Sequence, residues 1–291
     1  CVASAARKHV SRKSCLHAKW PWPLLQPSKF CSRQCARALR STLEIQPLQF
    51  RCSGFFYVRS VTHPSFAPLP AFDPRDVPVV RVDHHLPAVP AAAQTPSALR
   101  QRFATPPLWQ PEVVQEKQFL QRAMAPAAVL VPIVQRDQPT VLLTERTAHL
   151  SNHSGQIAFP GGKADPEDAS PADTALREAH EEVGLERRYV EVLGALPIYR
   201  TGSAFIITPV VALVQPGFTL QPNPYEVAAV FEVPLAFLLN PAHHQRHAVV
   251  WEGVRREWFS MPYDDEGTQR FIWGATAGML RNFYRFMSAG G

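Results

Sequence analysis

The feature that most constrains this fold is a well-delimited helix placed between segments of strand length. The segments 127–134 (AAVLVPIV) and 140–146 (TVLLTER) precede the helix, and the polar turn between them predicts a hairpin. Later segments with strand character are 190–197, 205–214, 259–263 and, mixed with helical character, 226–239. An amphipathic helix is predicted to close the chain at about 268–286. Strands on both sides of one helix, followed by a second helix, predict an α/β sandwich with a mixed sheet.

The central helix has start and stop signals at both ends. Ser170 is a natural N-cap, Pro171 suits the first helical position, and Asp173 completes a capping-box-like pattern. Gly184 is well placed to cap the C-terminal end. The helix is therefore predicted to run from about Pro171 to Val183.

Three carboxylates crowd one face of this predicted helix. Glu178, Glu181 and Glu182 stand at i, i+3 and i+4. Like charges at this spacing destabilise an isolated helix by about 0.2–0.5 kcal/mol per pair. A divalent cation would compensate for the repulsion, and oxygen-only ligands favour Mg²⁺ or Mn²⁺ over zinc. The alternative is an ordinary solvated acidic face.

Other residues near this helix have properties that suit a phosphate site. Arg177 directly precedes the first glutamate and could hold a carboxylate in place. Gly161 and Gly162 follow an apolar stretch, where a backbone could approach a ligand closely. Arg146 ends a predicted strand and could contact phosphate, with a plain surface arginine as the alternative.

Residues 161–185, GGKADPEDASPADTALREAHEEVGL, resemble the Nudix box, G-x5-E-x7-R-E-U-x-E-E-x-G-U, in which U is aliphatic. The second half of the box is matched at Arg177, Glu178, Glu181, Glu182, Gly184 and Leu185. The first half departs from it, because Asp168 replaces the glutamate and eight residues, not seven, separate it from Arg177. One residue is inserted before the helix.

A second stretch narrows the resemblance to one branch of the family. Residues 142–162, LLTERTAHLSNHSGQIAFPGG, resemble the coenzyme A diphosphatase signature L-L-T-x-R-[SA]-x3-R-x3-G-x3-F-P-G-G. Two positions differ, since Thr147 stands where Ser or Ala is expected and Ser151 replaces an arginine. The resemblance covers roughly residues 124–287.

The resemblance implies a Nudix-type α/β/α sandwich and metal-dependent hydrolysis of coenzyme A to 3′,5′-ADP and 4′-phosphopantetheine. It implies that Glu178, Glu181 and Glu182 hold Mg²⁺ or Mn²⁺ and that Arg177 orients a glutamate. Glu226 lies where related enzymes bring a further carboxylate to the metals, and either it or a helix glutamate would be the general base. Gly161 and Gly162 would shape the phosphate cradle, with Arg146 as a further substrate-binding residue.

Two other functions stay open. The first is another Nudix specificity, for ADP-ribose or a dinucleotide such as NADH, which the changes at Thr147 and Ser151 keep possible. The second is a non-catalytic Nudix module that binds a ligand. The complete set of Arg177 and the three glutamates argues against the second, because a silent domain has no physical reason to keep repelling carboxylates together.

The first 60 residues differ in composition from the rest. They hold 11 Lys and Arg against one acid, Glu44, and all five cysteines. The pI near 9.2 therefore belongs to this leader and does not indicate nucleic-acid binding. The leader could be a mitochondrial-type targeting segment, a zinc or disulfide element, or sequence upstream of the true start at a valine such as Val58 or Val61. In each case we expect it to be poorly structured or not part of the mature protein.

The chain is expected to divide into the leader (1–60), a Pro/Ala-rich arm or linker (61–123) and the hydrolase domain (124–291). The arm is predicted to contain one short helix near 97–103. The segment HHQRH (243–247) is expected to be a solvated loop rather than a metal site.

Composition also bears on location. No apolar run reaches 18 residues, so no membrane span is expected. The absence of cysteine from residues 61–291 fits a reducing compartment. We expect a cytoplasmic protein, or a mitochondrial one if the leader is a targeting segment. The sequence does not define the oligomeric state.

Overall fold

The computed structural model describes residues 73–120, 122–148, 155–251 and 253–290. All of them lie in one compact unit that spans Thr62–Gly291. The leader predicted at 1–60 and the signature position Ser151 lie outside the described residues. Among the helices of the described part, none is both long and apolar enough to cross a bilayer.

The larger sheet has eight strands, and its central pair is parallel. Its main order is β4 (Ile157–Ala158), β3 (Thr140–Arg146), β2 (Ala125–Val134), β8 (Phe205–Val214) and β6 (Val190–Ala195). Three further strands join it, β5 (Gly161–Lys163) on β2, β7 (Tyr199–Arg200) on β8 and β9 (Val227–Pro234) on β3. β2 and β8 run parallel, whereas the other pairs are antiparallel. The sheet is therefore mixed, as predicted.

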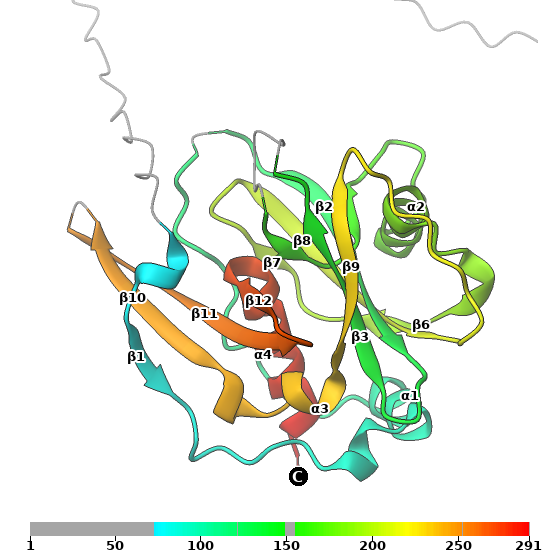
Figure 1. Ribbon diagram of the computed structural model, residues 1–291, viewed down its shortest axis with the longest axis horizontal. Helices are drawn as coiled ribbons and strands as arrows, with labels where there is room; N and C mark the ends of the chain where they lie inside the picture. The colour runs from blue at the N-terminus through cyan, green and yellow to red at the C-terminus, as the bar shows by residue number, and fades with distance from the viewer. Residues whose placement is uncertain (1–72, 121, 149–154, 252, 291) are drawn as a thin grey trace, which may run out of the picture. The chain divides into compact units, whose positions relative to one another are not determined.

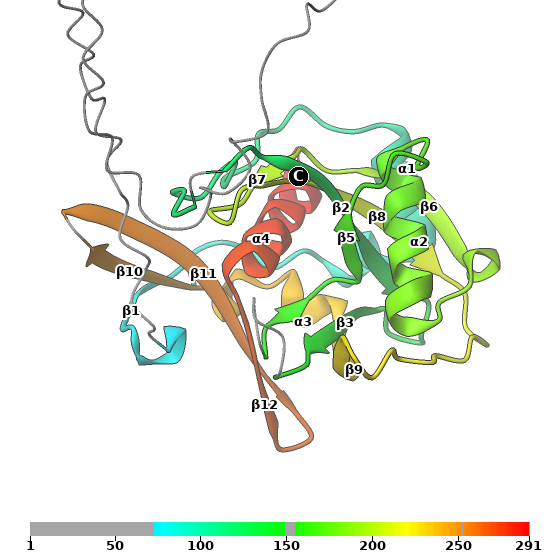
Figure 2. The ribbon, with the colours of Figure 1, turned by 90° about the horizontal axis from the view of Figure 1, so that it is seen from above.

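The two faces of this sheet are covered by two long helices, α2 (Pro171–Val183) and α4 (Gly274–Ser288) (Figures 1 and 2). Successive residues of β2 point to opposite faces, so Ala128 and Leu130 pack with α2 while Val129 and Val131 pack with α4. A strand buried on both faces must be apolar throughout, which explains the continuous run in the sequence. This arrangement confirms the predicted α/β/α sandwich.

A second, four-stranded antiparallel sheet packs beside α4. Its order is β1 (Val79–Val82), β10 (Gln245–Trp251), β11 (Val254–Asp265) and β12 (Thr268–Trp273). The remaining elements are α1 (Pro96–Ala104), α3 (Leu235–Leu238), η1 (Pro74–Asp76), η2 (Ala91–Gln94), η3 (Arg187–Tyr189) and η4 (Pro241–His243). β9 followed by α3 accounts for the mixed signal at 226–239.

Two sequence expectations were wrong in this region. The closing helix begins at Gly274, not at Thr268, because residues 268–273 pair with β11 and this tertiary pairing overrides helical periodicity. The segment 243–247 is not a solvated loop. His244 is fully buried and His247 lies in β10 with 2% of its surface exposed.

The described part of the predicted arm, residues 73–120, packs against the domain formed by residues 124–290. β1 pairs with β10, and the short helix predicted near 97–103 is present as α1, which buries Leu99 completely. The side chain of Phe103 packs against that of Phe286 at 4.8 Å between ring centroids. These residues are therefore not a free linker.

A buried ion network joins this arm to α4. Arg281, only 2% exposed, donates through Nη2 to Asp83 at 2.8 Å and through Nε to Glu112 at 2.7 Å. Its Nη1 lies 3.2 Å from Nδ1 of His244, whose Nε2 lies 2.8 Å from the carbonyl of Leu238. Because Arg281 can only donate, Nδ1 of His244 accepts and Nε2–H donates, so the ring is neutral.

Acid is expected to destabilise the protein through His244. Burial lowers the pKa of His244 to about 4, whereas an unfolded histidine titrates near 6.5. Between these pH values the histidine is protonated in the unfolded chain but neutral in the folded one. The free energy of unfolding therefore falls as pH drops from about 6.5 to 4, by up to ~3 kcal/mol. Glu182 titrates with the opposite sign in the same range, so the contribution of His244 is taken as the difference between the wild type and His244→Gln, each unfolded in urea at pH 7 and pH 4.5. The exposed control His85→Gln should show the same pH dependence as the wild type; an identical pH dependence in His244→Gln would contradict the assignment.

Candidate active site

The glutamate helix, α2, has the bounds and caps that the sequence predicts. The hydroxyl of Ser170 accepts the backbone N–H of Asp173 at 3.2 Å and donates to its carboxylate at 2.7 Å. Gly184 adopts a left-handed conformation with φ of 72°, and its N–H donates to the carbonyl of His180 at 2.9 Å. The caps fix where the helix starts and stops, and hence which residues its inner face carries.

The three helix glutamates occupy different environments. The side chain of Glu182 is 6% exposed and that of Glu178 16%, whereas Glu181 is 56% exposed. Nη1 of Arg177 donates to Glu178 at 2.9 Å and to Glu181 at 3.1 Å. Arg177 therefore offsets the repulsion between these two carboxylates, and among the described residues no three acidic, His or Cys side chains form a ready-made metal cage.

Glu182 is the buried centre of the site. Its Oε2 accepts the N–H of Gly161 at 3.1 Å, and its Oε1 lies 3.6 Å from Nη1 of Arg146. Desolvation raises the pKa of Glu182 to about 7, and the charges of Glu178 and Glu226 add to the rise. Burial thus disfavours the ionised form of this carboxylate, which a bound cation would stabilise.

Glu226 lies close enough to the helix glutamates for its charge to act on Glu178 and Glu182, while its role in the reaction stays a prediction. Burial raises the pKa of Glu178, and negative charge on Glu181 and Glu226 contributes. Glu226 belongs to the segment between β8 and β9, which runs beside α2 in Figure 1. Asn223 in this segment donates its N–H to the carbonyl of Glu182 at 2.8 Å. The segment is therefore attached to the end of the glutamate helix.

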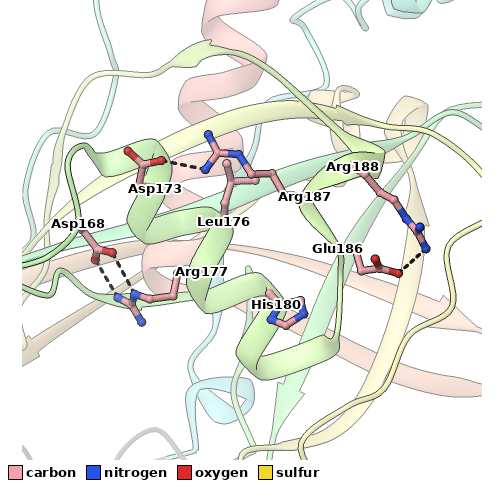
Figure 3. A pocket seen from close by; sticks show the side chains of 8 residues that line it. All are labelled: Asp168, Asp173, Leu176, Arg177, His180, Glu186, Arg187 and Arg188. Carbon is pink, nitrogen blue, oxygen red and sulfur yellow. Dashed lines mark hydrogen bonds and ion pairs between the residues drawn. The ribbon is translucent and has the colours of Figure 1, made fainter. Parts of the chain in front are cut away.

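Arg177 is held by Asp168, the residue at which the sequence departs from the Nudix box. Nε and Nη2 of Arg177 donate to the two carboxylate oxygens of Asp168 at 3.0 and 2.9 Å (Figure 3). Asp168 also accepts the hydroxyl of Thr174 at 2.9 Å and the N–H of Asp165 at 2.9 Å. Arg177 holds the pKa of Asp168 well below its usual range. The loop with its extra residue thus still delivers an acid to Arg177.

A hollow along the outer side of α2 is not the reaction site. In Figure 3 the ion pairs Arg177–Asp168, Arg187–Asp173 and Arg188–Glu186 neutralise its arginines. None of the three metal-binding candidates lines it; its lining consists of Asp168, Asp173, Leu176, Arg177, His180, Glu186, Arg187 and Arg188. With paired charges and without the buried glutamates, it lacks the groups that the chemistry needs.

The two glycines before the helix leave space for different neighbouring groups. A Cβ on Gly161 would lie 2.5 Å from the backbone carbonyl of Ala128 in β2, so this glycine permits close strand pairing. A Cβ on Gly162 would lie 2.5 Å from the carboxylate carbon of Glu178, so this glycine leaves room for a glutamate side chain. Because the N–H of Gly161 is bonded to Glu182, a phosphate cradle at these glycines stays a prediction.

Gly162→Ala is expected to reduce activity far more than stability. The new methyl group would displace the flexible Glu178 carboxylate, and a displacement of about 1 Å in a catalytic group can reduce the rate about 100-fold. In the matched variant Gly161→Ala the clash is with backbone, so unfolding should become easier by about 1–3 kcal/mol. Turnover and urea unfolding of both variants measure the contrast. Wild-type turnover by Gly162→Ala would contradict the role given to this glycine.

The donor set fits a hard divalent cation. It consists of carboxylate oxygens from Glu178 and Glu182, with Glu181 at the exposed rim and Glu226 close by. Oxygen-only ligands suit Mg²⁺ or Mn²⁺. Burial raises the pKa of Glu182, and a bound cation would offset this cost of holding the ionised carboxylate in the fold.

Sequence reasoning missed two residues that join the parts of this site. Thr147 bonds to the turn that carries Glu226, and Asn223, the first residue of this turn, bonds both to its later residues and to the end of α2. The only sequence signal for Thr147 was its departure from the signature, and Asn223 showed only as a turn residue before a proline. Their contacts join segments far apart in the chain, which local patterns do not reveal.

Comparisons with known proteins agree with this geometry. A family model for the NUDIX domain matches residues 124–257. A protein of Yersinia enterocolitica described as the uncharacterized Nudix hydrolase NudL is 46% identical over 155 residues, which are 53% of this chain and 77% of the relative. The NudL protein of Yersinia pestis is 43% identical over 162 residues, 56% of this chain and 79% of the relative.

Solved structures are more distant. The NUDIX domain of Shewanella oneidensis NrtR, crystallised with ADP ribose, is 26% identical and covers 40% of this chain and 77% of that one, with a TM-score of 0.32. A Nudix hydrolase of M. smegmatis, RenU, is also 26% identical and covers 39% and 71%, again with a TM-score of 0.32. These TM-scores are too low to transfer any property to this chain.

Proposed function

We propose that this chain, which belongs to the Nudix hydrolase family, hydrolyses the diphosphate bond of coenzyme A or its derivatives. The family acts on nucleoside diphosphate derivatives and generally uses divalent metal ions. The products from coenzyme A would be 3′,5′-ADP and 4′-phosphopantetheine. The observation that carries the proposal is the buried Glu182 beside Arg146, since Arg146 belongs to the stretch that resembles the coenzyme A signature.

The chain's own residues suit the hydrolysis of an anhydride. When bound, Mg²⁺ or Mn²⁺ neutralises phosphate charge and lowers the pKa of water. Glu178, Glu181 and Glu182 would hold the ion, while Arg177, anchored by Asp168, keeps the first two in place. Water oxygen forms a bond to one phosphorus, the bridging P–O bond of the anhydride breaks, and the released phosphate leaves as an anion. Glu226 or a helix glutamate takes the proton from the water.

Arg146 is suited to contact the substrate. It ends β3, its side chain is 28% exposed, and Glu182 is its ion-pair partner at 3.6 Å. This distance is longer than a hydrogen bond, so the guanidinium can turn toward a phosphate without breaking one. Its planar fork matches two phosphate oxygens at once.

The sequence gives some support to a different substrate, ADP-ribose or NADH. Thr147 and Ser151 differ from the coenzyme A signature, and the lost arginine at 151 removes a positive charge from the loop. ADP-ribose or NADH would use the same metal helix. A non-catalytic module is disfavoured, because Arg177 and all three helix glutamates are present and Arg177 donates hydrogen bonds to Glu178 and Glu181.

Product analysis by mass tests the proposal. The full chain is incubated with Mg²⁺ or Mn²⁺ and, separately, with coenzyme A, ADP-ribose and NADH. We expect 3′,5′-ADP from coenzyme A, formed faster than any product from the other two. Faster cleavage of ADP-ribose or NADH would establish another Nudix specificity. No cleavage of any substrate would make the ligand-binding module the better description.

A further inference from the structure

The turn that carries Glu226 is anchored at one side to the glutamate helix. Gln221 donates its N–H to the carbonyl of Val183 at 2.9 Å, and Asn223 donates to the carbonyl of Glu182 at 2.8 Å. Both acceptors are among the last carbonyls of α2, which have no partner within the helix. These bonds fix the start of the turn but leave Glu226, three residues later, to be placed by other contacts.

The other side of the turn is held by Thr147, just beyond the end of β3. Its backbone N–H donates to the carbonyl of Glu226 at 3.0 Å, and its hydroxyl donates to the carbonyl of Tyr225 at 3.0 Å. Thr147 is 6% exposed, so this hydroxyl bond is shielded from water. Two successive carbonyls of the turn thus bond to one residue of the signature stretch.

Side-chain packing does not hold this turn in place. The Tyr225 side chain is 76% exposed, although its ring is the largest apolar group of the turn. Instead, Tyr225 donates its N–H to the side-chain oxygen of Asn223 at 3.1 Å, and Glu226 donates its N–H to the backbone carbonyl of Asn223 at 3.0 Å. The carboxylate of Glu226 accepts Nδ2 of Asn223 at 3.4 Å, and the next residue, Val227, is buried and pairs with Arg146 at the end of β3. The two bonds from Thr147 attach the turn itself, one step before this pair, to the same end of β3.

We propose that Thr147 is a positioning residue whose hydroxyl holds the 223–226 turn, and with it the carboxylate of Glu226, beside Glu178 and Glu182. This inference rests on the proposed function, because the proposed hydrolysis is what gives Glu226 a role in catalysis. Thr147 keeps the hydroxyl of serine, one of the two residues expected at this position of the signature. Serine or threonine supplies the hydroxyl that Tyr225 accepts, whereas alanine cannot.

Loss of the hydroxyl should loosen the turn without releasing it. In Thr147→Val the shape of the side chain is kept and the Tyr225 carbonyl loses a donor, while the backbone bonds of Thr147 and Asn223 persist. We expect kcat to fall about tenfold, with KM little changed, because a misplaced catalytic group slows the reaction more than it weakens binding. Thr147→Ser keeps the hydroxyl and should retain nearly full activity.

A double-mutant cycle with Glu226→Gln separates positioning from general damage to the fold. If Thr147 acts through Glu226, Thr147→Val has no further effect once Glu226 is replaced. The control is Thr144→Val in β3, three residues earlier, which removes another buried hydroxyl, bonded at 3.2 Å to the carbonyl of Ala158. Its effect, if any, should be the same in both backgrounds. The substrate is whichever of coenzyme A, ADP-ribose and NADH the wild type cleaves.

Binding of Mn²⁺ alone, followed by electron paramagnetic resonance, gives a readout that does not depend on turnover. Glu226→Gln should weaken Mn²⁺ binding several-fold, since it removes a negative charge near the site. Thr147→Val should weaken it by a smaller factor, and the double variant should match Glu226→Gln. Thr147→Val effects of equal size in both backgrounds, or no effect in either, would overturn the inference. A wild type that cleaves no substrate would refute the proposed function, and the Mn²⁺ cycle would still decide on Thr147.

Discussion

Replacing Glu182 by glutamine is expected to lower kcat/KM about 100- to 1000-fold, the loss typical of removing a preorganised charged or polar group from a reaction centre. Glutamine has the same shape and can still accept the N–H of Gly161. It removes the buried charge that, in the proposed function, holds the divalent cation. Steady-state kinetics with the cleaved substrate measures the loss.

The same variant should be more stable than the wild type in metal-free alkaline buffer. The pKa of Glu182 is raised to about 7 in the fold, against about 4.5 for an unperturbed side chain. A raised carboxyl pKa means that stability falls as pH rises from about 4.5 to 7, by up to ~3 kcal/mol. Glu182→Gln lacks this penalty. The control Glu186→Gln replaces a surface glutamate paired with Arg188 and should change neither property. Equal turnover by Glu182→Gln and the wild type would remove this residue from the site.

Replacing Arg281 by leucine is expected to destabilise the fold by about 3–5 kcal/mol, the usual result of removing one partner of a buried ion network. The change would remove the buried cation that joins Asp83, which is 2% exposed, to Glu112. Arg81 and Arg246 would remain as the closest cations to these acids. Urea unfolding at neutral pH measures the loss.

Arg285→Leu is the matched control on the same helix. Arg285 is 43% exposed and lies 3.8 Å from Glu112, so its loss should change stability by less than about 1 kcal/mol. Equal stability of both variants would mean that the arm does not depend on the ion network. A large difference would show that residues 73–120, through Asp83 and Glu112, are part of what keeps α4 in place.

The ion pairs of Arg281 bear on where the folded domain begins. A boundary before Met124 follows the start of the Nudix resemblance, but Asp83, Glu112 and Leu99 all precede it and are packed against later residues. A chain that begins at residue 124 would leave Arg281 buried without its acids. The arm is thus joined to the hydrolase domain by contacts that a linker would not make.

Local signals explain which parts of the fold were predictable. The caps at Ser170 and Gly184 set the ends of α2, and continuous apolar runs set β3 and β8 at the predicted bounds. The smaller sheet was not predictable, because β1 pairs with β10, a strand that lies far from it in the sequence. The segment 268–273 reads as the start of a helix until β11 is beside it.

For the candidate site, the sequence by itself determined which charged groups stand together on the helix. The spacing of Glu178, Glu181 and Glu182 places carboxylates on one side of a capped helix, because helical geometry depends only on neighbours in the chain. Only the tertiary structure decided how the burial and the bonding partners of these groups differ. Burial against the sheet raises the pKa of Glu182, Asp168 reaches Arg177 across a loop with an extra residue, and Thr147 fastens the turn of Glu226. Desolvation and long-range hydrogen bonds arise only when distant segments pack together, so no local pattern contains them.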